Sequence, residues 1–301
     1  MSAATGTDVT VTPHDGACGA TVTGVRLATL SDNAFAAVLA AWHTYGVLAF
    51  PGQHLSAEEH VTFSRRIGQL ENTNTRDRDS TEHRPTTLAL SNVNRRGELV
   101  ADPEARLNRY LRSNQHWHTD SSFKRISAKA SMLAAVEVPA EGGETEYADM
   151  RAAYDALDPG LQARLEELVA VHSIAWSQSL AMGEDDVLSP EEQRYLPPVR
   201  HRLVRVHEPT GRRSLFIGRH ARVIEGRDEG ESRALLDELL EGACQPPRVY
   251  RHRWQAGDAV LWDNRCMLHR GRPWDTRQAR VMRRTTIAGD PLPGDTNEWA
   301  L

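Results

Sequence analysis

The 301-residue sequence is poor in cysteine and lysine and has no long apolar run. Its cysteines are three, an odd number, and no two of them form a C-x-x-C pair. That pattern argues against a disulfide framework or a zinc cluster and fits a reducing cytoplasm. No apolar segment reaches the roughly 18 residues of a membrane span, and residues 1–6 lack a basic region followed by an apolar run. We therefore expect a cytoplasmic protein without a membrane span or secretory signal.

The basic residues are nearly all arginine, because Lys124 and Lys129 are the only lysines. The formal net charge is −5, which gives no reason to expect nucleic acid or an anionic membrane as a partner. A hydrophobic fraction of 40% with 26% charged residues is ordinary for a globular protein. The composition thus does not indicate a particular fold or chemistry, and both are inferred from the order of the residues.

Apolar periodicity and the positions of Gly and Pro divide the chain into predicted strands and helices. Strands are predicted at 8–28, 46–50, 87–91, 128–138, 145–148, 204–207, 214–217, 248–254, 259–263, 266–270 and 279–288. Helices are predicted at 31–42, from Ser56 to about residue 70, and at 150–157, 159–171 and 231–241. With no repeat and no linker, this order predicts one domain over residues 1–301. It should be mainly β with flanking helices and a jelly-roll, or double-stranded β-helix, core.

Two stretches are polar and without clear period. Residues 71–114 are predicted to be loop apart from one strand, and residues 176–198 are predicted to be irregular. Long loops in compact domains often cover a site. Both stretches are therefore predicted to be lids.

The motif His116-Trp117-His118-Thr119-Asp120 carries the first chemical signal. On an extended chain, a histidine and an aspartate two residues apart point the same way. They would supply two ligands of the 2-His-1-carboxylate triad of non-haem Fe(II) oxygenases. Short H-x-D strings also occur by chance, and spacing alone does not choose between His116 and His118.

Further candidates follow near the C-terminus. His269 ends an apolar strand and is the natural third ligand, although taken alone it also fits a half-buried histidine bonded to backbone. Arg280 and Arg284 have the same strand parity, and two arginines facing a core are costly unless they meet anions. Arginine's planar fork suits a carboxylate. The alternative is a solvated strand face in an arginine-rich chain.

Taken together, these motifs resemble the taurine/2,4-D dioxygenase (TauD/TfdA) family of Fe(II)- and 2-oxoglutarate-dependent oxygenases. The resemblance rests on residues 117–120, 142–145 (Gly-Gly-Glu-Thr) and 262–265 (Trp-Asp-Asn-Arg) with His269, Arg280 and Arg284, and it covers about residues 10 to 290. Residues 121–123, 148–157 and 249–254 are most similar to the 2,4-dichlorophenoxyacetate dioxygenase branch.

The resemblance implies a role for each candidate residue. His118, Asp120 and His269 would bind iron, while Arg280, helped by the Thr145 hydroxyl, would bind the distal carboxylate of 2-oxoglutarate. Arg284 would lie near the cosubstrate's other end or the acidic group of the substrate. The substrate side would include Asn114, His116, Ser121 and Arg284.

The implied activity is oxidation of a small carboxylic acid with Fe(II), 2-oxoglutarate and O2, releasing succinate and CO2. Hydroxylation, desaturation and epoxidation all use the same ligands. The substrate would be either an aryloxy or alkyl acid in catabolism or a natural product, such as a terpenoid acid or lactone in antibiotic biosynthesis. Relatives are often dimers or tetramers, so the resemblance also suggests a homo-oligomer.

One departure concerns the loop before the H-x-D motif. The phenoxyacetate enzymes carry lysines there, whereas this chain has arginines and no lysine. The resemblance therefore extends to an anionic substrate but does not specify the herbicide.

Two other classes of function stay open at the sequence level. One is a non-catalytic sensor that binds a metal and 2-oxoglutarate, against which the complete triad and both arginines argue. The other is a different metal enzyme on a jelly roll, such as a cupin-like isomerase or a zinc hydrolase, which needs neither Arg280 nor Thr145.

Overall fold

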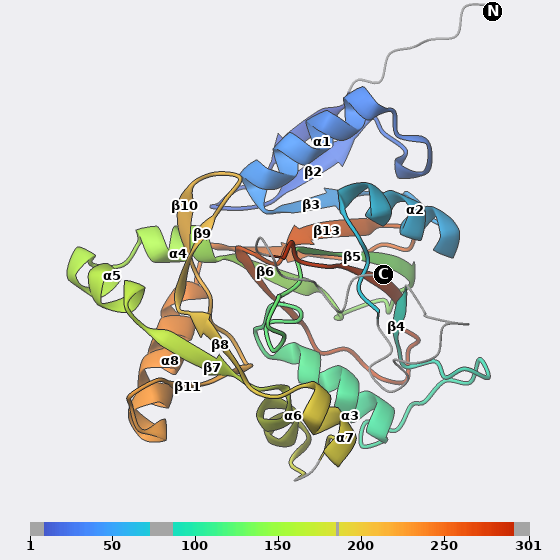
Figure 1. The fold of residues 1–301 in the computed structure, drawn as a ribbon. Coiled ribbons are helices and arrows are strands. Elements are labelled where there is room, and N and C mark those ends of the chain that lie inside the picture. Colours follow the sequence, from blue (N-terminus) through green and yellow to red (C-terminus); the bar gives the residue numbers. More distant parts are fainter. Residues whose placement is uncertain (1–8, 73–86, 185–186, 292–301) are drawn as a thin grey trace, which may run out of the picture.

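A large antiparallel sheet with one parallel pair organises the chain in the computed structural model, which describes residues 9–72, 87–184 and 187–291 (Figure 1). It has seven strands in the order β1-β2-β3-β13-β5-β15-β4. Their bounds are β1 Thr10–Pro13, β2 Ala20–Thr23, β3 Val47–Phe50, β13 Ala259–Asp263, β5 Ala130–Glu137, β15 Val281–Ile287 and β4 Leu88–Ser91. Strands from both ends of the sequence are thus neighbours in one sheet.

Both faces of this sheet are covered, which explains its continuous apolar runs. In β3, Leu48 and Phe50 pack into a cluster on one face, while Val47 and Ala49 pack into a second cluster on the other. Because side chains alternate across a strand, a run of apolar residues serves two cores at once.

Two helices cover the first face of the large sheet (Figure 1). They are α1 (Asp32–Tyr45) and α2 (Ala57–Ile67). Ser31 caps α1, and Ser56 forms a capping box with Glu59, so both helices begin at the positions predicted for them.

A three-stranded sheet, β12-β6-β14, packs on the second face and completes the jelly roll. Its strands are β12 (Val249–His252), β6 (Thr145–Asp149) and β14 (Met267–Gly271). Tyr147 of β6 and Met267 of β14 share a cluster with Trp262 of the large sheet. The predicted β core with flanking helices is therefore confirmed.

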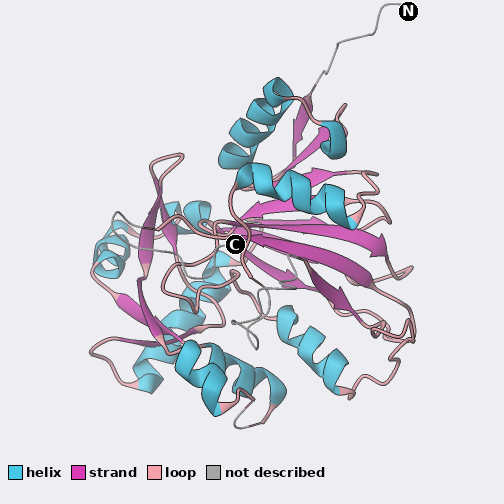
Figure 2. Ribbon diagram, turned by 45° about the vertical axis from the view of Figure 1, so that its right-hand side comes forward, coloured by secondary structure: helices cyan, strands magenta, loops and turns pink. Residues whose placement is uncertain are grey.

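The remaining elements form a second layer beside the jelly roll, around the cluster that includes Leu165, Leu236 and Leu268 (Figure 2). They comprise α4 Met150–Asp155, α5 Pro159–Glu166, α8 Glu229–Ala243, the sheet β11-β7-β8 (Ala221–Ile224, Val169–His172, Val199–Arg202) and the hairpin β9-β10 (Val204–His207, Arg212–Leu215). The strands predicted at 204–207 and 214–217 correspond to this hairpin. None of the helices in the described ranges is both long and apolar enough to cross a bilayer.

The predictions for three segments, 71–114, 159–171 and 176–198, were wrong. The helix expected over 159–171 ends at Glu166, because Val169 and Val171 pair with β8, Val171 also pairs with β11, and a β-branched residue packs well in a sheet. The predicted loop 71–114 contains α3 (Arg106–Arg112), followed by a 3-10 turn. Only two leucines mark α3, and Leu111 is buried. The part of this stretch at 73–86 lies outside the described residues.

The second predicted lid, 176–198, is largely helical. It holds most of α6 (Ile174–Met182) and all of α7 (Pro190–Tyr195). Ser173 caps α6, and Ser189 forms a capping box with Glu192. The Ser-x-x-Glu pattern at Ser189 and Glu192 is the sequence feature that marks the start of α7 within this polar segment.

Candidate active site

The two predicted histidine ligands are backbone neighbours. His118 forms an isolated antiparallel bridge with His269, with N···O distances of 3.0 and 2.7 Å. Their imidazole centroids lie 4.1 Å apart. Residues 151 positions apart in sequence are thus held together by main-chain hydrogen bonds, which bring the two rings close to each other.

Asp120 completes the group, and its carboxylate reaches the same point in space. The three buried residues each offer a ligand atom, and these atoms lie within 4.8 Å of one another. His118 Nδ1 lies 2.8 Å from the carbonyl oxygen of His116. If Nδ1 donates this hydrogen bond, the Nε2 lone pair is free for a metal, which is the usual arrangement of a ligating histidine. The donor set fits Fe(II) or a similar divalent cation.

The charge state of the three residues also suits a cation. Burial lowers the pKa of His118 far below its ordinary value and that of His269 to about 4, so both are neutral at pH 7. Burial alone would raise the pKa of Asp120, but the Arg284 guanidinium and then the two histidines outweigh it and hold that pKa well below its usual range. Two neutral imidazoles and one carboxylate result.

Two residues to which the sequence analysis gave no role support Asp120. The Ser131 hydroxyl donates to Asp120 Oδ2 at 2.7 Å, and the Asn264 amide donates to Ser131 at 2.9 Å. Asn264 Oδ1 also accepts from the backbone N–H of Asp120 and from Trp262 Nε1. Ser131 is the one hydroxyl in an otherwise apolar stretch, and Asn264 belongs to the Trp-Asp-Asn-Arg motif, so both carried a usable signal.

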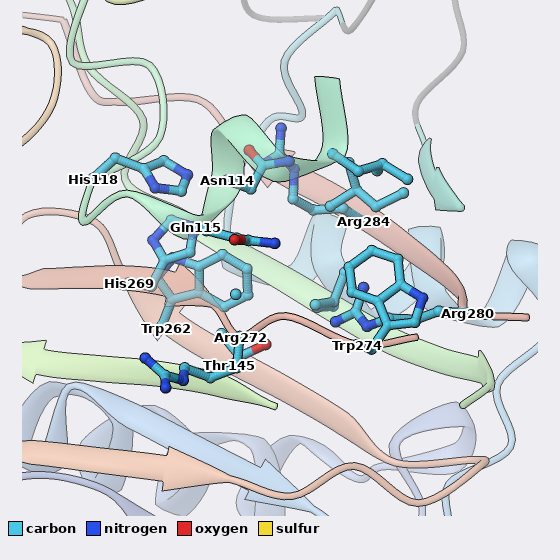
Figure 3. A pocket seen from close by; sticks show the side chains of 14 residues that line it. Asn114, Gln115, His118, Thr145, Trp262, His269, Arg272, Trp274, Arg280 and Arg284 are labelled. Atoms are coloured by element: carbon cyan, nitrogen blue, oxygen red, sulfur yellow. The ribbon is translucent and has the colours of Figure 1, made fainter. Parts of the chain in front are cut away.

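A cavity extends from the histidines to the two predicted arginines (Figure 3). His118 and His269 lie at one end, and Arg280 and Trp274 lie at the other. Arg284 lines the cavity between them and donates to Asp120 Oδ1 at 2.7 Å. Asn114, Gln115, Thr145, Trp262 and Arg272 complete the labelled wall.

Arg280 is buried at the far end of this cavity. Its Nε donates to the carbonyl oxygen of Gly143 at 3.2 Å, and its guanidinium lies 5.2 Å from the centroid of the Trp274 ring. Burial lowers the pKa of Arg280 to about 10. No carboxylate pairs with it within residues 9–72, 87–184 and 187–291. A buried cation without an anion is costly, so the site is built to receive one.

Thr145 lies in the same cavity, and its hydroxyl accepts a hydrogen bond from Trp254 Nε1 at 3.0 Å. The strand parity predicted for residues 280–284 is confirmed: Arg280 and Arg284 both line the cavity, whereas Arg283 points away and donates to Leu55. The candidates for binding a carboxylate, Arg280 and Arg284, therefore line the same cavity as His118 and His269.

Two predicted substrate residues lie elsewhere in the structure. Ser121 does not line this cavity; its hydroxyl donates to Glu71 Oε2 at 2.8 Å. The His116 side chain is exposed and lines a second cavity. Only the backbone oxygen of His116 serves the triad. Asn114, in contrast, lines the first cavity.

Two arginines of the 71–114 segment, Arg109 and Arg112, lie near the site and form ion pairs. Arg109 pairs with Glu184, and Arg112 pairs with Glu104 at 2.8 Å. These two side chains therefore stabilise α3 and its neighbours and do not line the cavity.

A second buried cluster contains residue types that can bind a metal, His207, Asp263 and Cys266. The His207 ring and the Asp263 carboxylate already have hydrogen-bond partners in the protein. His207 Nε2 lies 3.1 Å from the Asp263 carboxylate, which also accepts from Arg265. Burial raises the pKa of the Cys266 thiol, so it stays protonated. This cluster is a hydrogen-bonded part of the core.

A jelly roll with a 2-His-1-carboxylate group and a buried arginine at the far end of one cavity defines a non-haem iron oxygenase. Comparison with known proteins agrees: a model of the "Taurine catabolism dioxygenase TauD, TfdA family" matches residues 9–286. The chain belongs to this family. It is a 2-oxoglutarate-dependent dioxygenase, an oxidoreductase, which rules against the cupin-like isomerase, the zinc hydrolase and the non-catalytic sensor.

Curated relatives narrow the branch. The chain is 44% identical over 286 residues to the (S)-phenoxypropionate/alpha-ketoglutarate-dioxygenase of Sphingobium herbicidovorans, covering 93% of this chain and 95% of the relative. It is 46% identical over 248 residues to the alpha-ketoglutarate-dependent 2,4-dichlorophenoxyacetate dioxygenase of Cupriavidus pinatubonensis, covering 82% and 85%. Alpha-ketoglutarate is another name for 2-oxoglutarate. The predicted resemblance to this branch is confirmed.

A more distant relative is named for a different product. Pentalenolactone F synthase of Streptomyces arenae is 33% identical over 302 residues, covering 93% of this chain and 96% of the relative. Among solved structures, AAD-2 in complex with Mn(II) and N-oxalylglycine superposes with a TM-score of 0.84 at 37% identity, covering 94% of this chain and 99% of that one.

Proposed function

We propose that His118, Asp120 and His269 hold Fe(II) and that 2-oxoglutarate lies along the first cavity with its distal carboxylate on Arg280 and Thr145. The observation that carries this proposal is the arrangement in Figure 3, in which metal-ligand side chains and a buried arginine without a carboxylate partner, among the residues the structure describes, occupy opposite ends of one cavity. A dicarboxylate fits such a cavity because it brings a ligand to one end and an anion to the other.

With iron, 2-oxoglutarate and O2 bound, the site would supply the oxidation of a substrate C–H bond with release of succinate and CO2. In a hydroxylation, one oxygen atom enters succinate and the other enters the product. The chain's own residues fix the ligands and exclude water. Arg284 and Ser131 orient Asp120, and Trp262 closes one wall of the cavity.

We infer that the substrate is a small carboxylic acid of the aryloxyalkanoate class, in a catabolic reaction. The higher identity to phenoxypropionate and phenoxyacetate dioxygenases supports this class. A natural-product acid or lactone in secondary metabolism is the second candidate, supported by the more distant match to pentalenolactone F synthase.

We also infer a single oxygenase domain over residues 1–301, supported by one family model that matches residues 9–286. A cytoplasmic location is supported by the free state of Cys18, Cys244 and Cys266. A homo-oligomer stays a prediction.

The test is an anaerobic titration of the Fe(II)-loaded protein with 2-oxoglutarate, followed by a weak charge-transfer band in the visible. Arg280→Ala should weaken 2-oxoglutarate binding by about tenfold or more, since a hydrogen-bonded charge is lost. Arg277→Ala is the matched control, because Arg277 is exposed and pairs with Asp275. An unchanged band and affinity in Arg280→Ala would refute the assignment.

A further inference from the structure

The two triad members in the H-x-D motif are fixed to different sheets of the jelly roll. His118 exchanges main-chain hydrogen bonds with His269 of β14, in the three-stranded sheet. Two residues later, the backbone N–H of Asp120 donates to a side chain, Oδ1 of Asn264, at 3.2 Å. Asn264 directly follows β13 of the large sheet, and its backbone N–H donates to the carbonyl oxygen of Lys129. Asn264 therefore attaches the carboxylate end of the motif to the large sheet.

The orientation of the Asn264 amide follows from its neighbours. Its Oδ1 accepts from Trp262 Nε1 at 3.0 Å and from the Asp120 backbone N–H, and the Thr119 hydroxyl lies 3.1 Å away. An indole N–H and a backbone N–H can only donate, so the amide atom that faces them has to be the oxygen. The amide nitrogen therefore faces the Ser131 hydroxyl, 2.9 Å away. Rotation of the amide by half a turn would set donors against donors in a buried place.

This orientation sets the direction of the hydrogen bonds that follow. An amide nitrogen does not accept, so Ser131 Oγ accepts from Asn264 and keeps its single hydrogen for Asp120 Oδ2 at 2.7 Å. The other carboxylate oxygen accepts from Arg284 at 2.7 Å. Asp120 Oδ2 also lies 3.8 Å from His269 Nε2. Both carboxylate oxygens thus have a fixed donor, and the carboxylate cannot turn about its last bond without losing one of them.

These hydrogen bonds are shielded from solvent. Asn264 and Trp262 are each only 1% exposed, and Ser131 is fully buried. Trp262 also lines the first cavity, and its ring centroid lies 4.7 Å from that of His269 (Figure 3). In a dry environment, neighbouring hydrogen bonds strengthen one another and an unpaired member is costly. The same asparagine therefore orients a residue of the cavity wall and the Asp120 carboxylate.

We propose that Asn264 is a positioning residue for the metal site. It directs the Ser131 hydroxyl onto Asp120 and fastens the H-x-D segment to the large sheet. This inference rests on the proposed function, because it takes Asp120 to be a metal ligand. Asn264 lines neither the first nor the second cavity, so it acts through its neighbours and not by contact with a bound molecule. Residues that orient a metal ligand in this way commonly change metal affinity by about 10- to 100-fold.

Binding of Co(II) to the anaerobic, metal-free protein tests this role without turnover. The visible absorption of bound Co(II) reports both the dissociation constant and the geometry of the ligands. Ser131→Ala and Asn264→Leu should each weaken Co(II) binding by about 10- to 100-fold and change the shape of the spectrum. Trp262→Phe keeps a ring and loses the N–H donor. It should have a smaller effect in the same direction, because the Asp120 backbone N–H still faces the amide oxygen.

The double variant distinguishes connected hydrogen bonds from two independent contacts. If Asn264 acts through Ser131, the loss of Co(II) affinity in Ser131→Ala with Asn264→Leu should be smaller than the product of the two single losses. The difference should exceed about twofold, which is the range within which independent sites combine. If Asn264→Leu does not fold, Trp262→Phe takes its place in the double variant.

Two buried residues of the same types, outside this group, are matched controls. Asn108 is 2% exposed, and its amide donates to the carbonyl oxygens of Val100 and Asp102. Ser214 is fully buried in β10. Asn108→Ala and Ser214→Ala should leave the Co(II) constant within about twofold of wild type and the spectrum unchanged, whatever they do to stability. The thermal midpoint of the metal-free protein, measured for every variant, reports that stability.

Several results would overturn the inference. They are an unchanged Co(II) affinity and spectrum in Ser131→Ala, single losses that multiply in the double variant, or losses that follow the thermal midpoint in all variants, controls included. Two other results would instead refute the proposed function, on which the inference depends. They are no Co(II) spectrum in wild-type protein, or the same spectrum in His118→Ala as in wild type.

Discussion

Among single residues, Gly143 has a steric role at the Arg280 end of the cavity. Its φ is +69°, and a Cβ built there would lie 3.0 Å from Arg280 Nε and 3.1 Å from Cδ. The same residue accepts the hydrogen bond from Arg280 Nε. Only a residue without a side chain lets the backbone approach the guanidinium this closely.

Gly143→Ala should therefore displace Arg280 and weaken 2-oxoglutarate binding by about tenfold, beyond the general cost of about 1–2 kcal/mol for a left-handed alanine. The affinity is measured by anaerobic titration and the stability by urea unfolding. Gly226→Ala is the matched control, since Gly226 has a φ of +76° and open space around its Cα. If both variants lose stability equally and neither loses 2-oxoglutarate affinity, the steric role of Gly143 is wrong.

The histidines of the motif show what spacing in the sequence can and cannot decide. His116 and His118 have the same strand parity, so the pattern left both open. The bridge between His118 and His269 supports His118 as the proposed ligand, because it places the ring of residue 118 against the ring of residue 269. Which residue pairs with His118 in the bridge depends on the tertiary fold and cannot be deduced from the spacing of residues within the motif.

Among elements, a buried ion pair joins the segment after α2 to the turn that follows Asp120. Lys124 Nζ lies 2.6 Å from Glu71 Oε2, and both side chains are only 4% exposed. Ser121, with a φ of +57°, donates to the same oxygen. Glu71 in turn donates its backbone N–H to Thr286 in β15. The pair thus fixes the turn beside Asp120 to the large sheet.

Lys124→Met should leave Glu71 buried without its cation and lower the free energy of unfolding by about 3–5 kcal/mol. Urea unfolding of the metal-free protein measures this loss. The double variant Lys124→Met with Glu71→Leu should recover most of the stability, because no charge is then buried. A single-variant loss below about 1 kcal/mol would show that the pair does not fix the turn.

The strands and most helices were predictable from the sequence, whereas the lids were not. Continuous apolar runs such as residues 46–50 and 259–263 signal strands buried on both faces, and β3 and β13 lie there. The helix α3 carries four charged or polar residues among seven and is held by packing of Leu111 and by ion pairs of Arg109 and Arg112. Tertiary contacts of this kind leave little periodicity to detect.

Within the site, residues that bear charge were easier to predict than residues that support them. The triad, Thr145, Arg280 and Arg284 follow from chemistry and from the family resemblance. Ser131 and Asn264 act through hydrogen bonds to Asp120. Their roles depend on residues that are neighbours only in the folded structure, so these roles could not be deduced from the sequence.

For the whole molecule, metal and cosubstrate should stabilise the fold, because the ligands come from distant parts of the chain. His118 and Asp120 lie in the segment before β5, whereas His269 lies in β14, so a bound cation would link that segment to β14. Mn(II) at about 100 times its dissociation constant should add about 2.7 kcal/mol of stability.

Thermal unfolding with and without Mn(II) and N-oxalylglycine measures this gain. In wild-type protein the midpoint should rise with ligand concentration. His269→Ala should show no such rise, whereas His54→Ala, a variant at a histidine that belongs to neither cavity, should respond like wild type. The same rise in His269→Ala would place the metal elsewhere in the molecule.

Formation of succinate tests the assignment of iron and cosubstrate most directly. The protein is incubated with Fe(II), 2-oxoglutarate, O2 and phenoxyacetate, and succinate is quantified by NMR. Wild-type protein should form succinate in step with loss of the acid, and Asp120→Ala should form none above the metal-free background. Equal succinate from Asp120→Ala, or none from wild-type protein, would contradict the function proposed for this site.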